Sequence, residues 1–288
     1  MSQTTLIGWC DSTINGSSGC DGCELYQPPA TELTGDALKE WLKKWPCYAA
    51  HVHQNRLATS FPENYSKSFH HVRMIPGRFA QAAAWSDLRG KERPDKPWLS
   101  GKPRHIFVGD MGDFLSADVT DEFLEAELLA AITSEKGKRH VWMLLTKRPR
   151  RLAALSERWG GLPDNVIAMT TATSQRTADL RIPELLKVRC KWRGLSLEPL
   201  WTAIDVLKPV CESQSTVAGE RISKWIQLVI AGCESGPKRR QMDWAWVHSL
   251  NAQCQAAGAC FFLKQAEENG KVTDRPVPSF RQFPNILP

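Results

Sequence analysis

From residue 105 onward, short apolar runs alternate with longer segments in which apolar residues recur at helical spacing. The runs are almost wholly apolar and rich in branched and aromatic residues, which predicts short strands covered on both faces. Such runs occupy residues 105–111, 140–146, 165–171, 192–199, 225–232 and 259–265, and a shorter one occupies residues 5–9. The helical pattern occupies residues 121–137, 148–160, 174–188 and 242–258. Strands that alternate with helices predict parallel pairing through crossovers.

Nearly every predicted strand ends in polar residues that could take part in chemistry. These strand ends carry Asp11, Asp110, Asp113, Thr146, Lys147, Arg148, Thr170, Thr171, Thr173, Ser196, Glu198, Glu234, Ser235, Lys264 and Gln265. An open sheet gathers its ligands at one switch point, whereas a barrel gathers them from all its strands around one mouth. The even spread therefore predicts an α/β fold with a complete or partial TIM-type (βα) barrel of about six to seven parallel strands.

The chain of 288 residues is expected to form one barrel domain, to which the remaining segments are added. We expect an N-terminal cysteine loop at residues 10–50, an irregular insertion at residues 60–104 that roofs the barrel mouth, and an extended surface tail at residues 266–288. No apolar run reaches the length of a membrane-spanning helix, and the N-terminus does not resemble a secretory signal. The sequence thus predicts a cytoplasmic protein with no membrane partner.

Nine cysteines in a chain without a secretory signal favour free thiols over disulfides. Cys20, Cys23 and Cys47 cluster near the N-terminus and are the candidates for metal ligation. Thiolates select zinc, copper(I) or iron–sulfur clusters. The later cysteines lie singly in apolar or mixed surroundings, where burial as small apolar side chains is the favoured interpretation; they are Cys190, Cys211, Cys233, Cys254 and Cys260.

The number of ligands decides what the cysteine site can do. Four protein ligands would make a closed structural zinc site or an ordinary cluster. Three cysteines on a four-iron cluster would leave one iron open to a small molecule, as in enzymes that use S-adenosylmethionine. A fourth ligand could come from Cys10, His51 or His53, so the residues alone leave both arrangements open.

The charge balance is mildly basic, with a formal net charge of +6 and a pI near 8.8. This balance is compatible with a polyanionic partner without requiring one. Two basic clusters, at residues 147–151 and 237–240, could face phosphates or could be solvated loops.

Nine stretches, taken in order, resemble a known family. They are "GWCDSTIN", "GCDGC", "CYA", "IFVGDMGDFLS", "LLTKRP", "LPDNV", "RGLSLEPL", "VIAGCESGP" and "FFLKQ", and they span residues 7 to 265. The family that the chain resembles is phage- and prophage-associated, largely uncharacterised, and carries a three-cysteine motif like that of radical-SAM enzymes. The spacing here is C-x2-C-x23-C in place of the usual C-x3-C-x2-C, which indicates an insertion before the third cysteine.

The resemblance implies a 4Fe-4S cluster on Cys20, Cys23 and Cys47, and S-adenosylmethionine in the space above the strand ends. The residues that it assigns to cofactor binding are Asp110 and Asp113 near the amino group, Thr170, Thr171, Glu198 and Glu234 on ribose hydroxyls or the methionyl amine, and Lys147, Arg148 and Lys264 on a carboxylate or phosphate. The strand-end residues Thr146 and Ser235 are expected to join this set.

The function that the resemblance implies is a radical-SAM-like iron–sulfur enzyme of phage origin. It would act in the host-cell cytoplasm on nucleic acid or nucleotides by an adenosyl-radical mechanism, with a phage- or operon-encoded partner protein as a further expectation. The alternative is a non-catalytic phage binding or regulatory protein stabilised by zinc or by a cluster. A metal-independent hydrolase that uses the acidic strand-end residues is a third reading.

Overall fold

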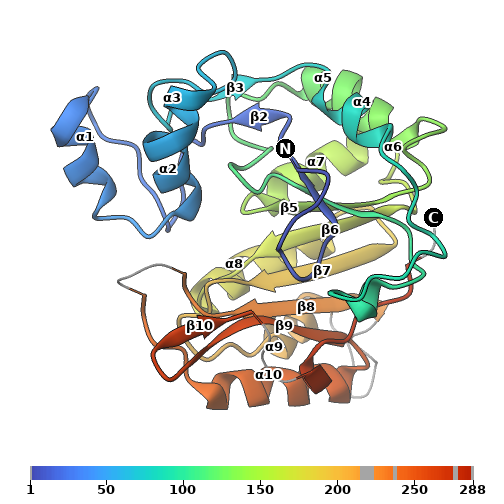
Figure 1. Ribbon diagram of the computed structural model, residues 1–288. Helices are drawn as coiled ribbons and strands as arrows, with labels where there is room; N and C mark the ends of the chain where they lie inside the picture. Colours follow the sequence, from blue (N-terminus) through green and yellow to red (C-terminus); the bar gives the residue numbers. More distant parts are fainter. Residues whose placement is uncertain (1, 215–223, 236–238, 275–277, 287–288) are drawn as a thin grey trace.

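The computed structural model describes residues 2–214, 224–235, 239–274 and 278–286 (Figure 1). Eight strands form one curved sheet in the order β1-β4-β5-β6-β7-β8-β9-β10. The strands are β1 (Ser12–Ile14), β4 (His105–Val108), β5 (Val141–Thr146), β6 (Val166–Thr171), β7 (Trp192–Leu197), β8 (Leu228–Gly232), β9 (Cys260–Glu268) and β10 (Lys271–Thr273). All neighbours pair in parallel except β9 and β10, which are antiparallel.

The predicted TIM-type barrel of six to seven parallel strands is therefore wrong. The sheet is mixed and open, because its edge strands β1 and β10 do not pair with each other, and it curves only into a half-barrel. Asn269 and Gly270 join β9 to β10 with φ values of 51° and 73°. An Asn-Gly pair of this conformation makes a two-residue hairpin loop. The chain after β9 thus folds back along that edge, where closure would need β1.

The four predicted helical regions are present, with shorter bounds. They are α7 (Pro149–Arg158), α8 (Gln175–Leu186), α10 (Trp244–Ala257) and a continuous segment made of α5 (Asp121–Phe123), the π-helical η3 (Leu124–Leu129) and α6 (Ala130–Thr133). Ser174 begins α8 with a capping box, and Gly258 ends α10 in the left-handed conformation. A further helix, α9 (Leu207–Gln214), was not predicted.

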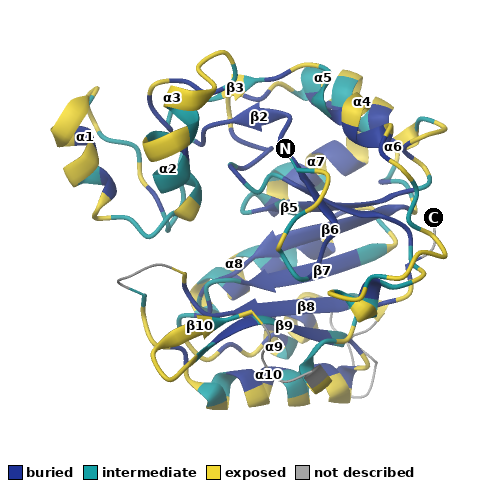
Figure 2. Cartoon of the chain, in the orientation of Figure 1, coloured by how far each residue is buried: buried dark blue, intermediate teal, exposed yellow. Residues whose placement is uncertain are grey.

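Alternate residues of each strand enter two different apolar clusters. In β5, Trp142 and Leu144 pack in the large core beneath the helices, whereas Val141 and Met143 face the inner side of the half-barrel. The central strands are accordingly buried on both faces (Figure 2). This double burial explains why the strands are continuous apolar runs in the sequence.

The two ends of the chain fill the inner face that a closed barrel would fill with its own strands. Trp9 and Cys10 pack there with Phe107 and Phe262, and Ile286 joins them with no exposed surface. The apolar run at 5–9 is therefore part of a plug and is not a strand. The tail predicted to lie extended on the surface instead adds β10, the 3-10 turn η5 (Pro278–Phe280) and this buried isoleucine.

The basic insertion at 60–104 holds the plug in place. It contains β3 (Arg73–Met74), α4 (Arg78–Ala83) and the 3-10 turn η2 (Pro97–Leu99). The Lys96 ammonium donates to the carbonyl oxygens of Thr5 at 2.7 Å, Ile7 at 2.9 Å and Cys10 at 2.6 Å. The guanidinium of Arg93 lies 2.7 Å from the Asp11 carboxylate. These cations thus serve the fold, and they do not roof the strand ends as predicted.

A smaller layer covers the carboxyl ends of the strands, on the side to which the arrows of β5–β8 point (Figure 1). It consists of α1 (Gly35–Leu42), α2 (Tyr48–Val52), the π-helical η1 (His53–Leu57), α3 (Ala58–Ser60) and the pair β2 (Ser17–Ser18) and β3. Its own apolar cluster includes Tyr26, Leu38 and Phe69. Among the described residues, no helix has both the length and the apolar character needed to cross a membrane.

Acid should destabilise the folded protein, because the buried histidine His105 resists protonation. Burial lowers the pKa of His105 to about 4, against the opposing pull of the Asp11 carboxylate and with the help of Arg93 and Lys102. The unfolded chain binds this proton near its ordinary pKa, so the stabilisation is complete above about pH 6.5 and is lost as the pH falls to about 4. We expect a loss of roughly 3 kcal/mol from this residue, measured by urea unfolding across that range. The variant His105→Asn should show a shallower slope, and an equal slope would contradict the assignment.

Candidate functional site

A cavity of about 1290 Å³ lies at the carboxyl ends of the strands. The predicted cofactor residues that line it are Asp110, Asp113, Thr146, Lys147, Glu198, Glu234, Ser235 and Lys264, and the three clustered cysteines line it too. Thr170 does not line it: this side chain is fully buried, and its hydroxyl donates to the Thr146 carbonyl oxygen at 2.8 Å. Of the insertion 60–104, only Phe69 reaches the cavity, whose outer wall is built largely by residues 43–51.

The C-x2-C loop is fixed by its backbone. The Cys20 amide donates to the Phe69 carbonyl oxygen at 2.8 Å, and Cys23 and Tyr26 exchange backbone hydrogen bonds of 2.7 and 3.1 Å. Gly19 has a φ of +84°, and a Cβ there would lie 2.8 Å from the Phe69 oxygen. Glycine is therefore required at this position, because a side chain would push the loop away from the segment that supports it.

Each cysteine sulfur faces a hydrogen-bond donor. The Leu25 amide donates to the Cys23 sulfur at 3.3 Å, and the Ala50 amide donates to the Cys47 sulfur at 3.4 Å at the N-terminus of α2. The Arg148 guanidinium interacts with the Cys20 sulfur. Donors of this kind stabilise negative charge on sulfur, as thiolate ligands require.

Burial opposes that negative charge unless a cation shares it. Burial raises the pKa of the Cys47 thiol to about 12 and raises the pKa of Cys23 as well, while the Lys147 ammonium acts against both shifts. A metal centre lowers the pKa of a coordinating thiol enough to deprotonate it. The surroundings of these thiols therefore suit a buried thiolate–metal centre better than free reactive thiolates.

The spacing of the sulfurs separates zinc from a cluster. In a tetrahedral zinc site, ligand sulfurs lie about 3.8 Å apart because each bond is about 2.3 Å. The three cysteines are not among the described groups whose ligand atoms all lie within 4.8 Å of one another. In a four-iron cluster each cysteine binds a different iron, so wider separation is expected. As they lie, the three sulfurs do not have the spacing of three ligands of one tetrahedral zinc ion.

Of the three predicted fourth ligands, only His51 reaches the cavity. Cys10 is fully buried in the plug and does not line the cavity. His53 is also buried, and its Nε2 lies 2.8 Å from the Ser66 carbonyl oxygen. The Nε2 of His51 is already engaged at 2.9 Å with the carbonyl oxygen of Trp45.

Arg148 ties the cysteine loop to the sheet. Its guanidinium lies 2.9 Å from the Asp113 carboxylate, pairs with Asp21, and donates to the Gly22 carbonyl oxygen at 3.0 Å. The second oxygen of Asp21 accepts from the Ala117 amide at 2.9 Å. The residues between Cys20 and Cys23 are thus held directly against the end of β5.

Asp113 is fully engaged in this support. Its carboxylate also accepts the Thr146 hydroxyl at 2.7 Å, the Leu115 amide at 3.0 Å and the Lys147 amide at 2.8 Å. A carboxylate with so many internal donors positions Arg148 and the ends of β4 and β5. Its predicted contact with a ligand amino group would need one of these bonds to break.

A second ion pair anchors the same loop from the other side. The Arg181 guanidinium, on α8, makes hydrogen bonds of 2.8 and 2.6 Å to both oxygens of Glu24 and donates to the Thr171 carbonyl oxygen at 2.9 Å. Burial acts to raise the pKa of Glu24, but the hydrogen bonds and charge of Arg181 outweigh it and hold this pKa below its ordinary value. The loop is therefore clamped between β5 and the α8 side of β6.

Two further ion pairs occupy the far wall of the cavity. The Lys264 ammonium lies 2.9 Å from Glu198, and Arg240 lies 3.2 Å from Glu234. Gly232 makes room for the first pair, because a Cβ there would lie 2.9 Å from the Glu198 oxygen. Four of the cavity's charged groups thus neutralise one another in pairs.

Asp110 is a carboxylate at the cavity whose charged form is disfavoured by burial. Burial raises the pKa of Asp110, and the Asn15 amide group, which donates to it at 2.5 Å, acts against the shift. The side-chain oxygen of Asn15 accepts from the Met111 amide at 3.0 Å. Asp110 is therefore held in one orientation at the end of β4.

Several residues of the site were not found from the sequence. Asp21 lies inside the recognised "GCDGC" stretch and could have been singled out as its only charged member. Glu24 and Arg181 lie far apart in the chain, and no local pattern relates them. Cys233 was interpreted as a buried apolar side chain; it is buried, and it also lines the cavity.

The fold and the cavity define an α/β protein with an open half-barrel sheet and three cysteines at the strand ends. Residues 4–278 match the model of the family described as "Protein of unknown function (DUF5131)", so the chain belongs to this family. Comparisons with curated proteins and with solved structures found no match.

Removing the Arg148 guanidinium should destabilise the protein. Arg148→Met leaves Asp113 and Asp21 without their cation, and the loss of one partner of a buried pair costs about 3 kcal/mol or more. Urea unfolding should show this loss. The control Arg150→Met changes an exposed arginine two positions away and should stay within about 0.5 kcal/mol. Equal stability of the two variants would contradict the role of Arg148.

Proposed function

We propose that the protein is a radical-SAM-like iron–sulfur enzyme that acts on a phosphate-bearing substrate, with nucleic acid or a nucleotide as the expected class. The observation that carries the proposal is that Cys20, Cys23 and Cys47 line the same cavity as the polar strand ends. Phage origin, action in the host-cell cytoplasm and a phage- or operon-encoded partner protein rest on the resemblance and belong to the same proposal.

The hydrogen-bond donors beside the three cysteine sulfurs and the cavity that the cysteines share support a four-iron cluster. When bound, such a cluster with one open iron supplies, after reduction by an external one-electron donor, the electron that cleaves S-adenosylmethionine to an adenosyl radical. The Leu25 and Ala50 amides and the Arg148 guanidinium would stabilise the thiolates. The α2 layer would exclude water from the cavity during the reaction.

The paired charges on the far wall suit a zwitterionic ligand. An α-amino acid group carries one ammonium and one carboxylate. Its ammonium would bind the carboxylate, and its carboxylate the cation, of the Glu198–Lys264 pair or the Glu234–Arg240 pair. Charge-assisted hydrogen bonds of this kind are stronger than neutral ones. Asp110 would meet the ligand from the opposite side of the cavity, at the end of β4.

The zinc-stabilised binding protein is less well supported. Cys10, the fourth thiolate expected from the sequence, lies in the plug away from the cavity lining, and Cys233, which does line the cavity, lies on the far wall beyond the end of β8. The hydrolase hypothesis uses Asp110, Asp113, Glu198 and Glu234 as free carboxylates. Asp113, Glu198 and Glu234 are engaged with cations, and Asp110 accepts the Asn15 amide group.

Metal analysis of anaerobically purified protein tests the proposal. We expect about four irons and matching sulfide per chain, and cleavage of S-adenosylmethionine after dithionite reduction. Cys47→Ser should lose the cluster, whereas Cys10→Ala and the exposed Cys211→Ser should keep it. A colourless protein with one zinc, or loss of iron only in Cys10→Ala, would contradict the proposal.

A basic surface adjoins the cavity and supports a polyanionic substrate. A second hollow of about 520 Å³ between α7 and α8 shares Lys147 and Arg148 with the cavity and includes Arg150. Among the described residues, neither the Lys147 ammonium nor the Arg150 guanidinium has a carboxylate partner within 4.0 Å. In the other basic cluster, residues 237 and 238 lie outside the described part of the chain, and Arg239 and Arg240 pair with Glu267 and Glu234.

Binding to a labelled single-stranded oligonucleotide should depend on these two cations. Each phosphate contact contributes about 1 to the slope of log affinity against log salt concentration. Lys147→Ala and Arg150→Ala should each weaken binding and lower that slope by about 1, while the distant Lys136→Ala should change neither. Salt-independent binding, or equal effects of all three substitutions, would contradict a substrate phosphate in this hollow.

A further inference from the structure

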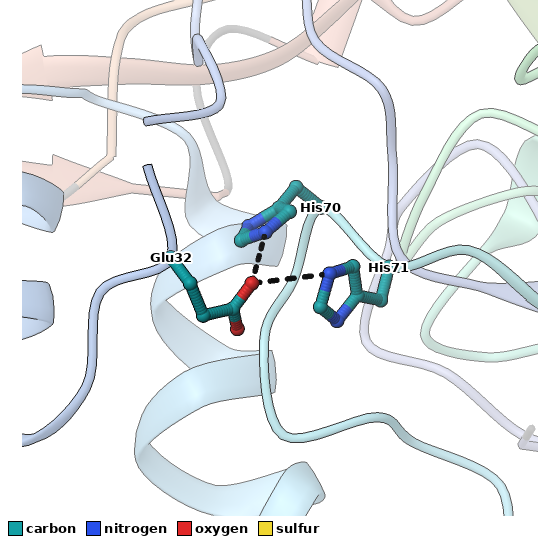
Figure 3. A group of neighbouring side chains, drawn as sticks. All are labelled: Glu32, His70 and His71. Atoms are coloured by element: carbon teal, nitrogen blue, oxygen red, sulfur yellow. Dashed lines mark ion pairs between the residues drawn. The ribbon is translucent and has the colours of Figure 1, made fainter. Parts of the chain in front are cut away.

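Three side chains outside the cavity converge on one point. The Nε2 atom of His70 lies 3.5 Å from the Oε2 atom of Glu32, and the Nε2 atom of His71 lies 3.4 Å from the same oxygen (Figure 3). All three atoms lie within 4.8 Å of one another. None of the three residues lines the cysteine cavity.

These separations match those of ligands around one metal ion. Zinc binds imidazole nitrogen and carboxylate oxygen at about 2.0–2.2 Å, so two such ligands of a tetrahedral ion lie about 3.4 Å apart. Two histidines and one carboxylate form a set that zinc uses where one position stays open to solvent. The half-exposed side chains of Glu32 and His71 leave a path for the ion, while His70 is largely buried.

The two rings have no other polar role in the described part of the chain. Among the described residues, the Glu32 carboxylate is the polar partner of each imidazole. The two rings also pack edge to face, with centroids 4.3 Å apart. The other oxygen of Glu32 accepts the Ser68 hydroxyl at 3.2 Å. A hydrogen bond of this kind orients a ligating carboxylate.

The cluster joins two irregular segments beside the cysteine loop. Glu32 lies between Tyr26 and α1, and the histidines follow Phe69, whose carbonyl oxygen accepts the Cys20 amide. A bound ion would cross-link these segments and so restrain the backbone that supports Cys20. Neither segment has a helix or strand of its own to do this.

We propose that Glu32, His70 and His71 form a divalent metal site of the zinc type, independent of the cysteine site. The ion is held by two imidazole nitrogens and one carboxylate oxygen, and solvent completes its coordination. This inference does not depend on the iron–sulfur proposal, because it uses none of the same residues.

Zinc titration of the full chain with Cys20, Cys23 and Cys47 all replaced by serine tests the site. We expect one zinc per chain by calorimetry and a higher melting temperature in zinc, as mass action requires. Glu32→Gln and His71→Ala, each in the same background, should weaken binding at least tenfold. His248→Ala removes an exposed histidine on α10 and should leave the affinity unchanged. Absence of zinc binding, or equal affinity in all variants, would overturn the proposal.

Cobalt provides a second measurement that uses the unaltered cysteines. Cobalt on imidazole and carboxylate lacks the strong thiolate-to-metal absorption that cobalt on cysteine shows. We expect the wild-type chain to bind a cobalt ion without that absorption, and Glu32→Gln to lose this ion only. If every bound cobalt shows thiolate absorption, the proposed site does not exist, whatever the iron content of the cysteine site.

Discussion

The position of the cysteine loop depends on one chain of charges: Asp113, Arg148 and Asp21. Asp113 is held by amides and a hydroxyl at the ends of β4 and β5, so it fixes the guanidinium of Arg148 in one place. Arg148 then binds the carboxylate and the carbonyl oxygen that lie between Cys20 and Cys23. Because these groups are largely buried, the pairing is strong only when every member is present. The Glu24–Arg181 pair, with Arg181 on α8 bonded to the end of β6, clamps the loop from its second side.

This support sets what the cavity can bind. The loop brings three sulfurs, each facing a donor, to the rim of a space whose other walls are strand ends. Burial raises the pKa of the Cys23 and Cys47 thiols, so these two are suited to a metal centre, whose charge compensates the thiolate, rather than to a free nucleophile. The ion pairs on the far wall neutralise each other and offer both signs of charge to a ligand, whereas the described lining as a whole holds more cations than carboxylates. Lys147 and Arg150, which have no carboxylate partner in the described part of the chain, extend the positive charge outward to the surface.

The strands could be predicted from the sequence because their physical signal is local. Runs such as 140–146 and 165–171 are apolar on both faces, and the structure buries both faces. Closure could not be predicted in the same way. The apolar run at 5–9 suits a strand and a plug equally, and long-range contacts such as those of Lys96 with three carbonyl oxygens select the plug. The Asn269–Gly270 hairpin did have a local signal, and reading it would have excluded closure after β9. Most of the strand-end residues gather at one cavity as a parallel sheet requires. The pairing of Arg148 with Asp21, and of Arg181 with Glu24, depends on contacts between distant segments.

The central claim is that the cysteine site holds a cluster with one iron open to a ligand in the cavity. Electron paramagnetic resonance of the dithionite-reduced protein, recorded with and without S-adenosylmethionine, tests this claim most directly. The account predicts a reduced-cluster signal whose shape changes when S-adenosylmethionine is added, because the ligand binds the open iron. An iron signal that S-adenosylmethionine leaves unchanged, or a protein with no such signal after anaerobic iron and sulfide reconstitution, would contradict it.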